Sequence, residues 1–338
     1  RFSGTLSLNM MMILLFLSSL TMFMSGIGAN FEYDLKKIIA LSTLSQLGLM
    51  LSILALGDCL LCFFHLLMHA LFKALLFMCA GMMIHNLNDC QDIRYMGSLV
   101  NFIPLTSCFF NISSLALCGI PFFSGFYSKD IILELMSSNY FNFYIYFIFY
   151  FSVGLTVSYS FRLIYYIMFN DFSVSEFVMF NDSSSIMLKS MGGLISFVVM
   201  GGSFISWIVF PSPYFMILPN SLKLMVLIIL LMGVWFGYFL SCINISEKIF
   251  GLMFYLVFCI FSSMWNLSYL STLGVNYYFL FMGGKFYKLV DQGWSEFYGS
   301  MGLFTFLKNQ SIMLHKIFLN NFKMFLFLLL IWFCVLYF

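Results

Sequence analysis

Long apolar runs separated by short polar stretches make up most of this chain. The runs cover residues 8–28, 37–57, 59–84, 101–136, 141–169, 190–210, 221–242 and 322–338. A helix of about 20 apolar residues is long enough to cross the hydrocarbon core of a bilayer. Strands of a membrane barrel would instead alternate apolar and polar residues. The pattern therefore predicts an all-α fold, a polytopic transmembrane helical bundle.

The composition agrees with lipid as the main solvent. Charged residues make up 8% of the 338 positions, against about 25% in soluble domains. The net charge of +2 gives no reason to expect nucleic acid as a partner, so membrane lipids are the expected surroundings. Most of the nine cysteines lie within apolar runs, where no disulfide framework is expected. Because the chain begins at Arg1 rather than methionine, we expect an amino-terminal part to be missing.

The run at 101–136 is too long for one straight helix. About 36 residues would extend roughly 54 Å, whereas the hydrocarbon core is about 30 Å thick. The run contains Gly119, Pro121 and Gly125, and a proline inside a helix removes a backbone donor and breaks the helix. Transporters use such discontinuous helices near the middle of the membrane. We therefore expect a break here, with an ordinary proline kink as the alternative.

The region from Lys285 to Lys316 mixes charged residues with aromatic and aliphatic ones. This mixture is typical of an amphipathic helix lying along the membrane surface, and an extramembrane loop is the alternative. Gly293, Gly299 and Gly302 are the expected points of interruption. The apolar run at 249–264 is short, and we interpret it as an interfacial helix rather than a span.

The strongest chemical signal is a stripe of three ionisable residues inside an apolar run. His65, His69 and Lys73 are spaced i, i+4, i+8 and so share one helix face. A lysine at the centre of a span costs about 2.5–3.5 kcal/mol on insertion scales, and such residues usually mark a proton or ion route. Histidine titrates near neutral pH, and a desolvated lysine can give up its proton. The stripe therefore favours a proton relay.

Three other interpretations of the stripe stay open. Two histidines one turn apart can bind zinc, but the next turn supplies a cation and no third ligand is near. Haem ligation requires histidines on facing helices, and only His85 and His315 remain for that purpose. The stripe could also be a purely structural polar cluster. The pair Cys59 and Cys62 lacks a second pair, so neither an iron–sulfur cluster nor zinc is expected there.

A second group of charges follows the expected helix break. Lys129 and Asp130 should open the second half of the broken helix, where a carboxylate is electrostatically favoured and a lysine is not. Lys129 is therefore either at a membrane edge or a buried cation that exchanges protons at the break. Glu134 lies one turn beyond Asp130 and is either a neighbour along the path or a charge at the rim.

Three long motifs occur in a fixed order: residues 34–48, with Ser45-Gln46-Leu47-Gly48; residues 65–74, with His-x3-His-Ala-Leu-Phe-Lys-Ala; and residues 119–130, with Gly-Ile-Pro-Phe-Phe-Ser-Gly-Phe-Tyr-Ser-Lys-Asp. Together they closely resemble the subunit 5 family of mitochondrial NADH:ubiquinone oxidoreductase, respiratory complex I. Residues 88–94 fit the same pattern, and residues 291–296 look like the start of the lateral helix of arthropod members. The resemblance covers essentially the whole chain.

The resemblance implies an antiporter-like fold of two inverted repeats, each with a discontinuous helix. This chain is expected to hold the second repeat at 1–210, further transmembrane or interfacial segments at 211–284, a long lateral amphipathic helix at 285–320 and a terminal transmembrane anchor at 321–338. The family's central relay maps onto His65, His69 and Lys73, with Lys73 as the key carrier. Lys129 matches the lysine that passes the proton onwards, and we assign Asp130 and Glu134 supporting roles.

The resemblance also implies a place in the mitochondrial inner membrane, within the membrane arm of the complex. Electron transfer from NADH to ubiquinone would drive proton pumping. Flavin, iron–sulfur clusters and ubiquinone are implied in partner subunits, and no cofactor or metal is expected in this chain. The expected partners are the other membrane-arm subunits, especially the neighbouring antiporter-like one. The first repeat and its part of the proton path are absent from this sequence.

Two functions of other classes are alternatives. One is the large subunit of a multisubunit cation/proton antiporter, which shares the motifs. The 46 phenylalanines, 26 methionines and 19 tyrosines favour a compact mitochondrial genome instead. The other is a non-pumping scaffold, which would require the lysines to lie at the membrane rim.

Overall fold

The computed structural model describes residues 3–138, 143–173, 181–182, 184–212, 216–242, 255–320 and 322–337. The chain forms two compact units, one ending at Trp265 and the other beginning at Asn266. The regular elements of the described residues are helices, and one isolated bridge joins Asp34 to Asp92. The prediction of an all-α fold is therefore confirmed.

The first unit is a bundle of mostly long helices. Its elements are a short 3-10 turn at Ser3–Thr5, α1 Leu8–Phe31, α2 Leu35–Ala55, α3 Cys59–Asn86, α4 Leu99–Phe102, α5 Pro104–Cys118, α6 Ser124–Ser138, α7 Phe143–Ile164 with a π-helical turn at Tyr165–Phe169, α8 Ser185–Val209, α9 Asn220–Cys242 and α11 Tyr255–Ser262. Six of the described helices (α1, α2, α3, α7 with its π turn, α8 and α9) are long and apolar enough to cross a membrane. The chain is a multi-pass membrane protein, as predicted.

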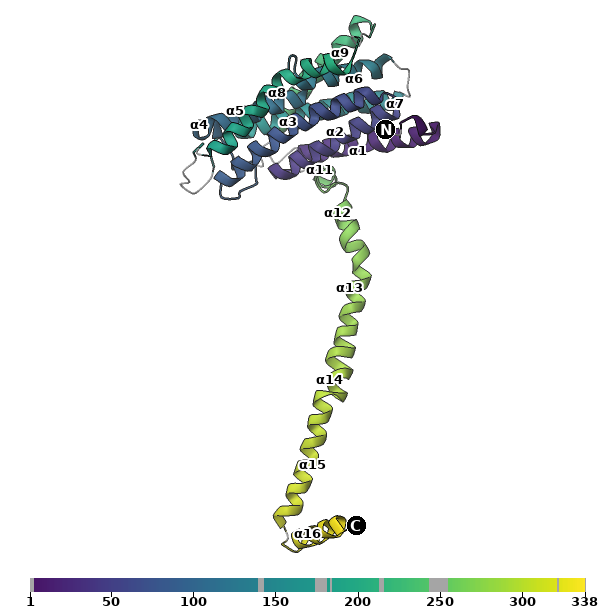
Figure 1. Ribbon diagram of the computed structural model, residues 1–338, viewed down its shortest axis with the longest axis vertical. Helices are drawn as coiled ribbons and strands as arrows, with labels where there is room; N and C mark the ends of the chain where they lie inside the picture. The colour runs from purple at the N-terminus through teal and green to yellow at the C-terminus, as the bar shows by residue number, and fades with distance from the viewer. Residues whose placement is uncertain are drawn as a thin grey trace. The chain divides into compact units, whose positions relative to one another are not determined.

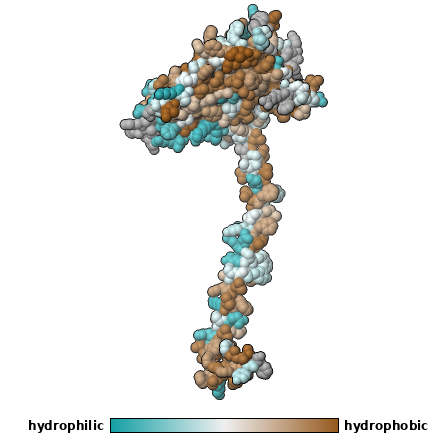
Figure 2. All heavy atoms as spheres, in the orientation of Figure 1, coloured by the Kyte–Doolittle hydropathy of each residue, from teal (hydrophilic) through white to brown (hydrophobic). Residues whose placement is uncertain are grey.

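Helix α3 lies at the centre of this bundle. It packs against α2, α5, α6 and α8, and α1, α2 and α3 run side by side (Figure 1). Its buried face carries Phe64, Met68, Phe72 and Leu75, all at 0% exposure. The outward side chains of the bundle are largely apolar, as the brown areas of Figure 2 show. An apolar outer surface is what a bundle solvated by lipid requires.

The predicted break in the long apolar run is present. Helix α5 ends at Cys118, Gly119 follows with φ +85°, and α6 begins at Ser124. Each half has 15 residues and is about 22 Å long, too short to cross the membrane alone. Pro104 stands in the first turn of α5, where a missing N–H is tolerated. The discontinuous helix is thereby confirmed.

One detail of the break differs from the prediction. Lys129 and Asp130 do not open the second half-helix, because α6 begins at Ser124 and both residues lie in its second turn. A turn at residues 120–123, closed by the bond from Phe123 N to Ile120 O, returns the chain to helical geometry at once. Gly125 then lies directly against the Ala116 carbonyl, so a side chain at this position would clash with α5.

Helix α9 packs closely on α7 through two glycines one turn apart. A Cβ placed on Gly233 would lie 2.8 Å from the Gly154 carbonyl oxygen, and one on Gly237 would lie 2.5 Å from the Ser158 carbonyl oxygen. Small residues spaced four apart allow such close approach of membrane helices. The α7–α9 contact therefore depends on the absence of side chains at these positions.

The turn between α1 and α2 is tied to the loop that follows α3. Leu35 N donates to Gln91 O at 2.9 Å, and Ile93 N donates to Tyr33 O at 3.0 Å. Arg94 pairs with Asp92 at 2.5 Å and lies 4.4 Å from the centre of the Tyr33 ring. Burial of Asp92 opposes its ionisation, but the hydrogen bonds from Arg94 outweigh this, and the pKa of the carboxyl lies below its usual range. These contacts hold the amino-terminal end of α2, the helix that carries the buried residues Ser42 and Ser45.

The second unit is helical over most of its length. Its elements are α12 Leu267–Tyr269, α13 Val275–Phe286, α14 Ser295–Tyr298, α15 Ser300–Asn320 and α16 Phe322–Tyr337, with π-helical turns at Leu270–Gly274 and Tyr287–Trp294. Helical structure over the region from Lys285 is thus present and already begins at Leu267, whereas the lateral position of this helix along the membrane stays a prediction. Gly293 lies in a π-helical turn, Gly299 separates α14 from α15, and Gly302 lies within α15.

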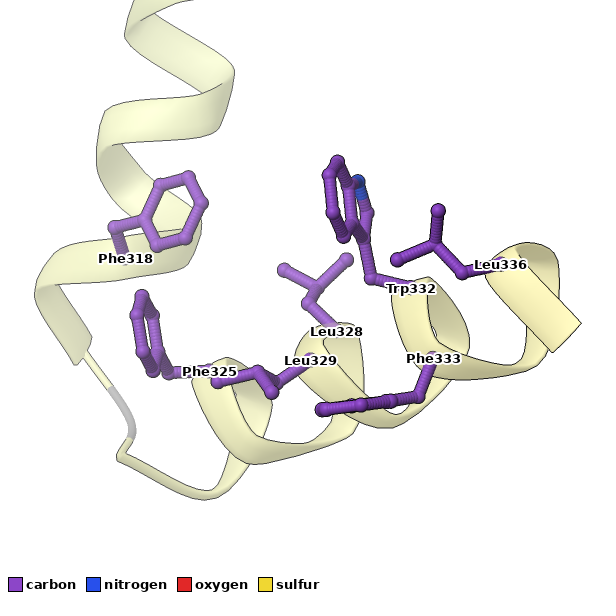
Figure 3. A pocket seen from close by; sticks show the side chains of 7 residues that line it. All are labelled: Phe318, Phe325, Leu328, Leu329, Trp332, Phe333 and Leu336. Carbon is purple, nitrogen blue, oxygen red and sulfur yellow. The ribbon is translucent and has the colours of Figure 1, made fainter.

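Helix α16 folds back on the end of α15 through aromatic contacts. The rings of Phe318 and Phe325 are 5.9 Å apart, and they line an apolar hollow together with Leu328 and Trp332 (Figure 3). In the run at 249–264, residues 249–254 lie outside the described residues. The part at Tyr255–Ser262 forms α11, where Phe258 packs on Phe31 of α1 with rings 5.2 Å apart. Its interfacial position stays a prediction.

Candidate proton-transfer site

The three ionisable residues of α3 form one stripe on the side that meets α2 and α6. His65 and Lys73 are buried, at 0% and 4% exposure, and His69 between them is half-buried. The rings of His65 and His69 are 6.4 Å apart. The Nε2 atom of His69 is buried and has no hydrogen-bond partner among the described residues. The stripe thus lies inside the bundle and does not face lipid.

Lys73 meets α2 through a hydroxyl group. Its ammonium donates to the Ser42 hydroxyl oxygen, and Ser42 in turn donates to the Ile39 carbonyl at 2.6 Å. Among the described residues the ion pairs are Lys37 with Asp34 and Arg94 with Asp92, so Lys73 has no carboxylate partner there. A hydroxyl can accept from an ammonium and can donate to a neutral amine. The contact therefore accommodates both protonation states of Lys73.

His65 joins α2 to α6. Its Nδ1 lies 2.9 Å from the Ser128 hydroxyl oxygen, and its Nε2 lies 3.2 Å from Oε1 of Gln46. Gln46 and Ser128 are both fully buried. Ser128 is the residue before Lys129, so His65 connects the α3 stripe to the charged part of α6.

Lys129 is held at the end of the first half-helix. Its side chain is 3% exposed, and its Nζ donates to the Leu117 carbonyl at 2.5 Å and to the Thr156 hydroxyl at 3.4 Å. A helical carbonyl normally accepts from the N–H four residues later, which for Leu117 would be Pro121, a residue without an N–H. Lys129 takes the carbonyl that the proline leaves free. Lys129 is thus a buried cation at the helix break, and its depth in the membrane stays a prediction.

Asp130 and Glu134 lie apart from these contacts. Both are half-buried on α6, one turn from each other, and Lys223 of α9 acts electrostatically on Asp130. Within the described ranges, neither carboxylate makes a hydrogen bond or an ion pair with the two histidines and two lysines. The structure thus links His65 to α2 and to Ser128, the neighbour of Lys129, and leaves the two carboxylates outside these contacts.

Sequence reasoning missed four polar partners, namely Ser42, Gln46, Ser128 and Thr156. Each is a polar side chain within an otherwise apolar helix, which is the signal that could have identified them. Of the candidate thiols, Cys62 donates to the Met50 carbonyl at 3.2 Å and Cys59 is exposed. No group of three or more His, Cys, Asp and Glu side chains able to hold a metal ion is present among the described residues.

Comparison with known proteins decides the family. The family model described as the C-terminus of NADH dehydrogenase subunit 5 matches residues 159–338. This chain belongs to that family. A second family model, described as the transmembrane region of NADH:quinone oxidoreductase and the Mrp antiporter, matches residues 2–156 and contains every residue of the site up to Thr156. The predicted resemblance is confirmed.

Relatives named NADH-ubiquinone oxidoreductase chain 5 align along nearly the whole chain. The protein from Locusta migratoria is 52% identical over 96% of this chain and 57% of its own length. The protein from Anopheles gambiae is 51% identical over 97% of this chain and 56% of its own length. The protein from Lumbricus terrestris is 37% identical over 86% of this chain and 50% of its own length. The chain thus spans about half the length of these relatives.

Solved structures agree on the fold. The Mrp complex from Dietzia sp. DQ12-45-1b matches with a TM-score of 0.57 and 19% identity, over 72% of this chain and 28% of the matched one. A membrane-bound sulfane sulfur reductase, an archaeal respiratory membrane complex, matches with a TM-score of 0.53 and 29% identity. The match covers 57% of this chain and 32% of the matched one. This chain therefore has an antiporter-like fold.

Proposed function

We propose that this chain carries protons as part of the membrane arm of respiratory complex I in the mitochondrial inner membrane. The single observation that carries the proposal is the position of His65. It is hydrogen-bonded on one side to α2, which also holds the partner of Lys73, and on the other side to α6, which holds Lys129. A titratable ring therefore lies between two buried lysines.

The hydrogen bonds of His65 allow a proton to arrive and leave with little movement. In the neutral ring, Nε2–H donates to Gln46 and Nδ1 accepts from the Ser128 hydroxyl. When Nδ1 gains a proton it donates to Ser128, whose hydroxyl can turn to the Gly125 carbonyl at 3.3 Å. Each state leaves every donor with an acceptor. The site is therefore suited to a group that changes charge inside the membrane.

Lys129 is the exit group of the proposed path. It lies where the helix is broken, and its partners are a carbonyl and a hydroxyl rather than a carboxylate. A cation held by neutral groups can release its proton without breaking an ion pair. Asp130 and Glu134, further along the same half-helix, are proposed to support the proton on its way to the nearer membrane face.

The energy for this movement must come from outside the chain. We infer that flavin, iron–sulfur clusters and ubiquinone act in partner subunits, and that a neighbouring antiporter-like subunit passes on the charge displacement. The relatives extend well beyond the half that this chain covers. The complete path is therefore assigned to the full-length subunit within its complex.

Replacing Lys73 by Met tests the proposal in the assembled complex. Removing a proton-transfer group typically lowers the rate by about 10²-fold or more, so proton translocation through this subunit should be almost lost. The matched control is Lys36→Met, which removes an exposed lysine from the first turn of α2. NADH oxidation and acidification are measured together in proteoliposomes.

Normal pumping stoichiometry in the Lys73→Met complex would contradict the proposal. A purified assembly that lacks flavin and iron–sulfur subunits, and that exchanges cations for protons, would favour the antiporter instead.

A further inference from the structure

Two buried polar atoms beside the His/Lys chain have no hydrogen-bond partner among the described residues. They are Nε2 of Gln46 and the hydroxyl of Tyr159. Gln46 is 0% exposed and Tyr159 is 2% exposed. Leaving a polar group unsatisfied in such surroundings is unfavourable, so two of them in one place call for a physical reason.

Tyr159 lies near groups that belong to the surroundings of both Lys73 and Lys129. Its hydroxyl is faced by the side chains of Ser42, Ser45 and Gln46. Ser42 accepts from Lys73, and Gln46 lies against Nε2 of His65. Tyr159 is also one helical turn after Thr156, which contacts Lys129. One face of α7 therefore contacts Lys129 through Thr156 and approaches, through Tyr159, the serine that accepts from Lys73.

We propose that Tyr159 is a positioning residue of this proton path, whose hydroxyl, joined to Gln46 by an internal water, fixes the direction of the Gln46 amide. The inference rests on the proposed function. A side-chain amide has an acceptor end and a donor end, and the acceptor end of Gln46 faces His65. The donor end then needs an acceptor, and the water supplies it. Tyr159 and the serine hydroxyls complete the two to four partners that a buried water requires.

The amide direction decides which nitrogen of His65 carries the proton. With Oε1 facing it, Nε2 must be the N–H, and the lone pair of Nδ1 points to Ser128 and the Lys129 side. A reversed amide would present its NH₂ group to Nε2, leaving the protonated ring without an acceptor there. Such outer partners fix histidine tautomers in the same way at metal sites. Tyr159 thus keeps the Nδ1 lone pair of His65 facing Ser128, where the ring exchanges its proton with the α6 side.

The test compares Tyr159→Phe with Tyr150→Phe in the complete complex. Tyr150 lies on the same helix, is 6% exposed and also has a hydroxyl without a partner among the described residues. It packs with Leu133, Val153 and Val226, away from the histidine stripe. The pair therefore separates the effect of the Tyr159 position from that of losing any buried tyrosine hydroxyl.

Loss of one hydrogen bond predicts a fall of roughly five-fold in proton translocation through the Tyr159→Phe subunit at its optimum pH. The alkaline limb of the pH profile should move to lower pH by about 0.5–1 unit, because the protonated ring has lost a fixed acceptor. The titratable groups that face His65 are Lys129 on α6 and His69 on α3, and both are unchanged in the two variants. Tyr150→Phe should match the unsubstituted complex.

Three results separate the possible failures. If Lys73→Met pumps normally, the proposed function itself is wrong. If Lys73→Met is impaired while Tyr159→Phe keeps the normal rate and pH profile, only the role of Tyr159 is overturned. If Tyr159→Phe does not assemble, a density map of the native complex decides. Water density between Tyr159 and Gln46 supports the proposal, and a dry contact or a reversed amide rejects it.

Discussion

At the scale of single residues, the hydrogen-bond partner of Lys129 follows from Pro121, earlier in the chain. Pro121 has no N–H to offer the Leu117 carbonyl, and this carbonyl is the closest partner of the Lys129 ammonium. The proline therefore breaks the helix and also leaves the acceptor that holds the cation. A buried lysine with only neutral partners is unusual enough to mark a site by itself.

This contact leads to a prediction for Lys129. The variant Lys129→Met should assemble, because methionine has a similar length and leaves only one unsatisfied carbonyl, which costs about 1–3 kcal/mol. Proton translocation through the subunit should fall by about 10²-fold or more, as expected for a proton-transfer group. The measurement is acidification per NADH oxidised.

Lys189→Met is the control for Lys129→Met, because Lys189 is an exposed lysine in the first turns of α8. An equal loss of pumping in both variants would indicate a general effect of removing positive charge and would count against a role for the helix break.

At the scale of helices, the contact between α7 and α9 holds α7 in place, and α7 provides part of the site. Helix α7 provides Thr156 and Tyr159, and its carbonyl groups at Gly154 and Ser158 touch the glycines of α9. Ser158 also donates to Asn30 of α1 at 2.9 Å. Helix α7 is thus held between α1 and α9, which keeps its polar residues in register with α2 and α6.

Replacing Gly237 by Ala should destabilise this arrangement. The new Cβ would lie 2.5 Å from the backbone oxygen of Ser158, so one helix must move. Overpacking of this kind typically costs about 1–3 kcal/mol. The thermal inactivation temperature of the complex should fall by a few degrees, with little change in the optimum pH of pumping.

A matched substitution is available in α8. Gly192 has open space around its Cβ position, so Gly192→Ala should be neutral or slightly stabilising, by up to about 1 kcal/mol. Equal loss of stability in the two variants would show that the close α7–α9 contact has no special importance.

The positions of the helices were predicted from the sequence more successfully than the contacts between them. The apolar runs at 8–28, 37–57, 59–84, 190–210 and 221–242 matched α1, α2, α3, α8 and α9 closely, because lipid requires a continuous apolar helix. Gly119 and Pro121 located the break for a similarly local reason. The start of α6 at Ser124 was missed, since it depends on the turn that follows the proline.

The sequence marks polar residues within apolar runs, but it does not show which of them contact the buried charges. Ser42, Gln46, Ser128 and Tyr159 lie on three different helices, and only the packing of α2, α3, α6 and α7 brings them to the stripe. The early start of helical structure at Leu267 was missed because residues 267–284 contain no charged residue, so the amphipathic pattern is absent there.

At the scale of the whole molecule, the two units differ in how their apolar side chains are covered. The first unit buries an extensive core around α3. In the second unit, large side chains such as Tyr277, Phe304 and Trp332 are exposed by 60% or more. Apolar surface on this scale requires lipid or protein neighbours. We therefore expect the second unit to act as a brace along neighbouring subunits, without a role in proton transfer.

Truncation after Trp265 tests this expectation. The full-length subunit without residues 266–338 should fail to remain in the complex, because the covering contacts of α13, α15 and α16 are lost. Native gel electrophoresis and subunit quantification measure retention. Stable assembly of the truncated subunit would show that the second unit is dispensable as a brace.

The break between α5 and α6 has an electrical consequence. Half-helices of equal length lie on either side of it, so on the proposed path we expect a proton on Lys129 to lie near the middle of the membrane voltage. A full crossing is worth about 2.3 kcal/mol per 100 mV, so release from Lys129 to either face works with or against about half of that, roughly 1 kcal/mol. On the proposed path, proton release from Lys129 towards the positive face should therefore slow as the membrane voltage rises.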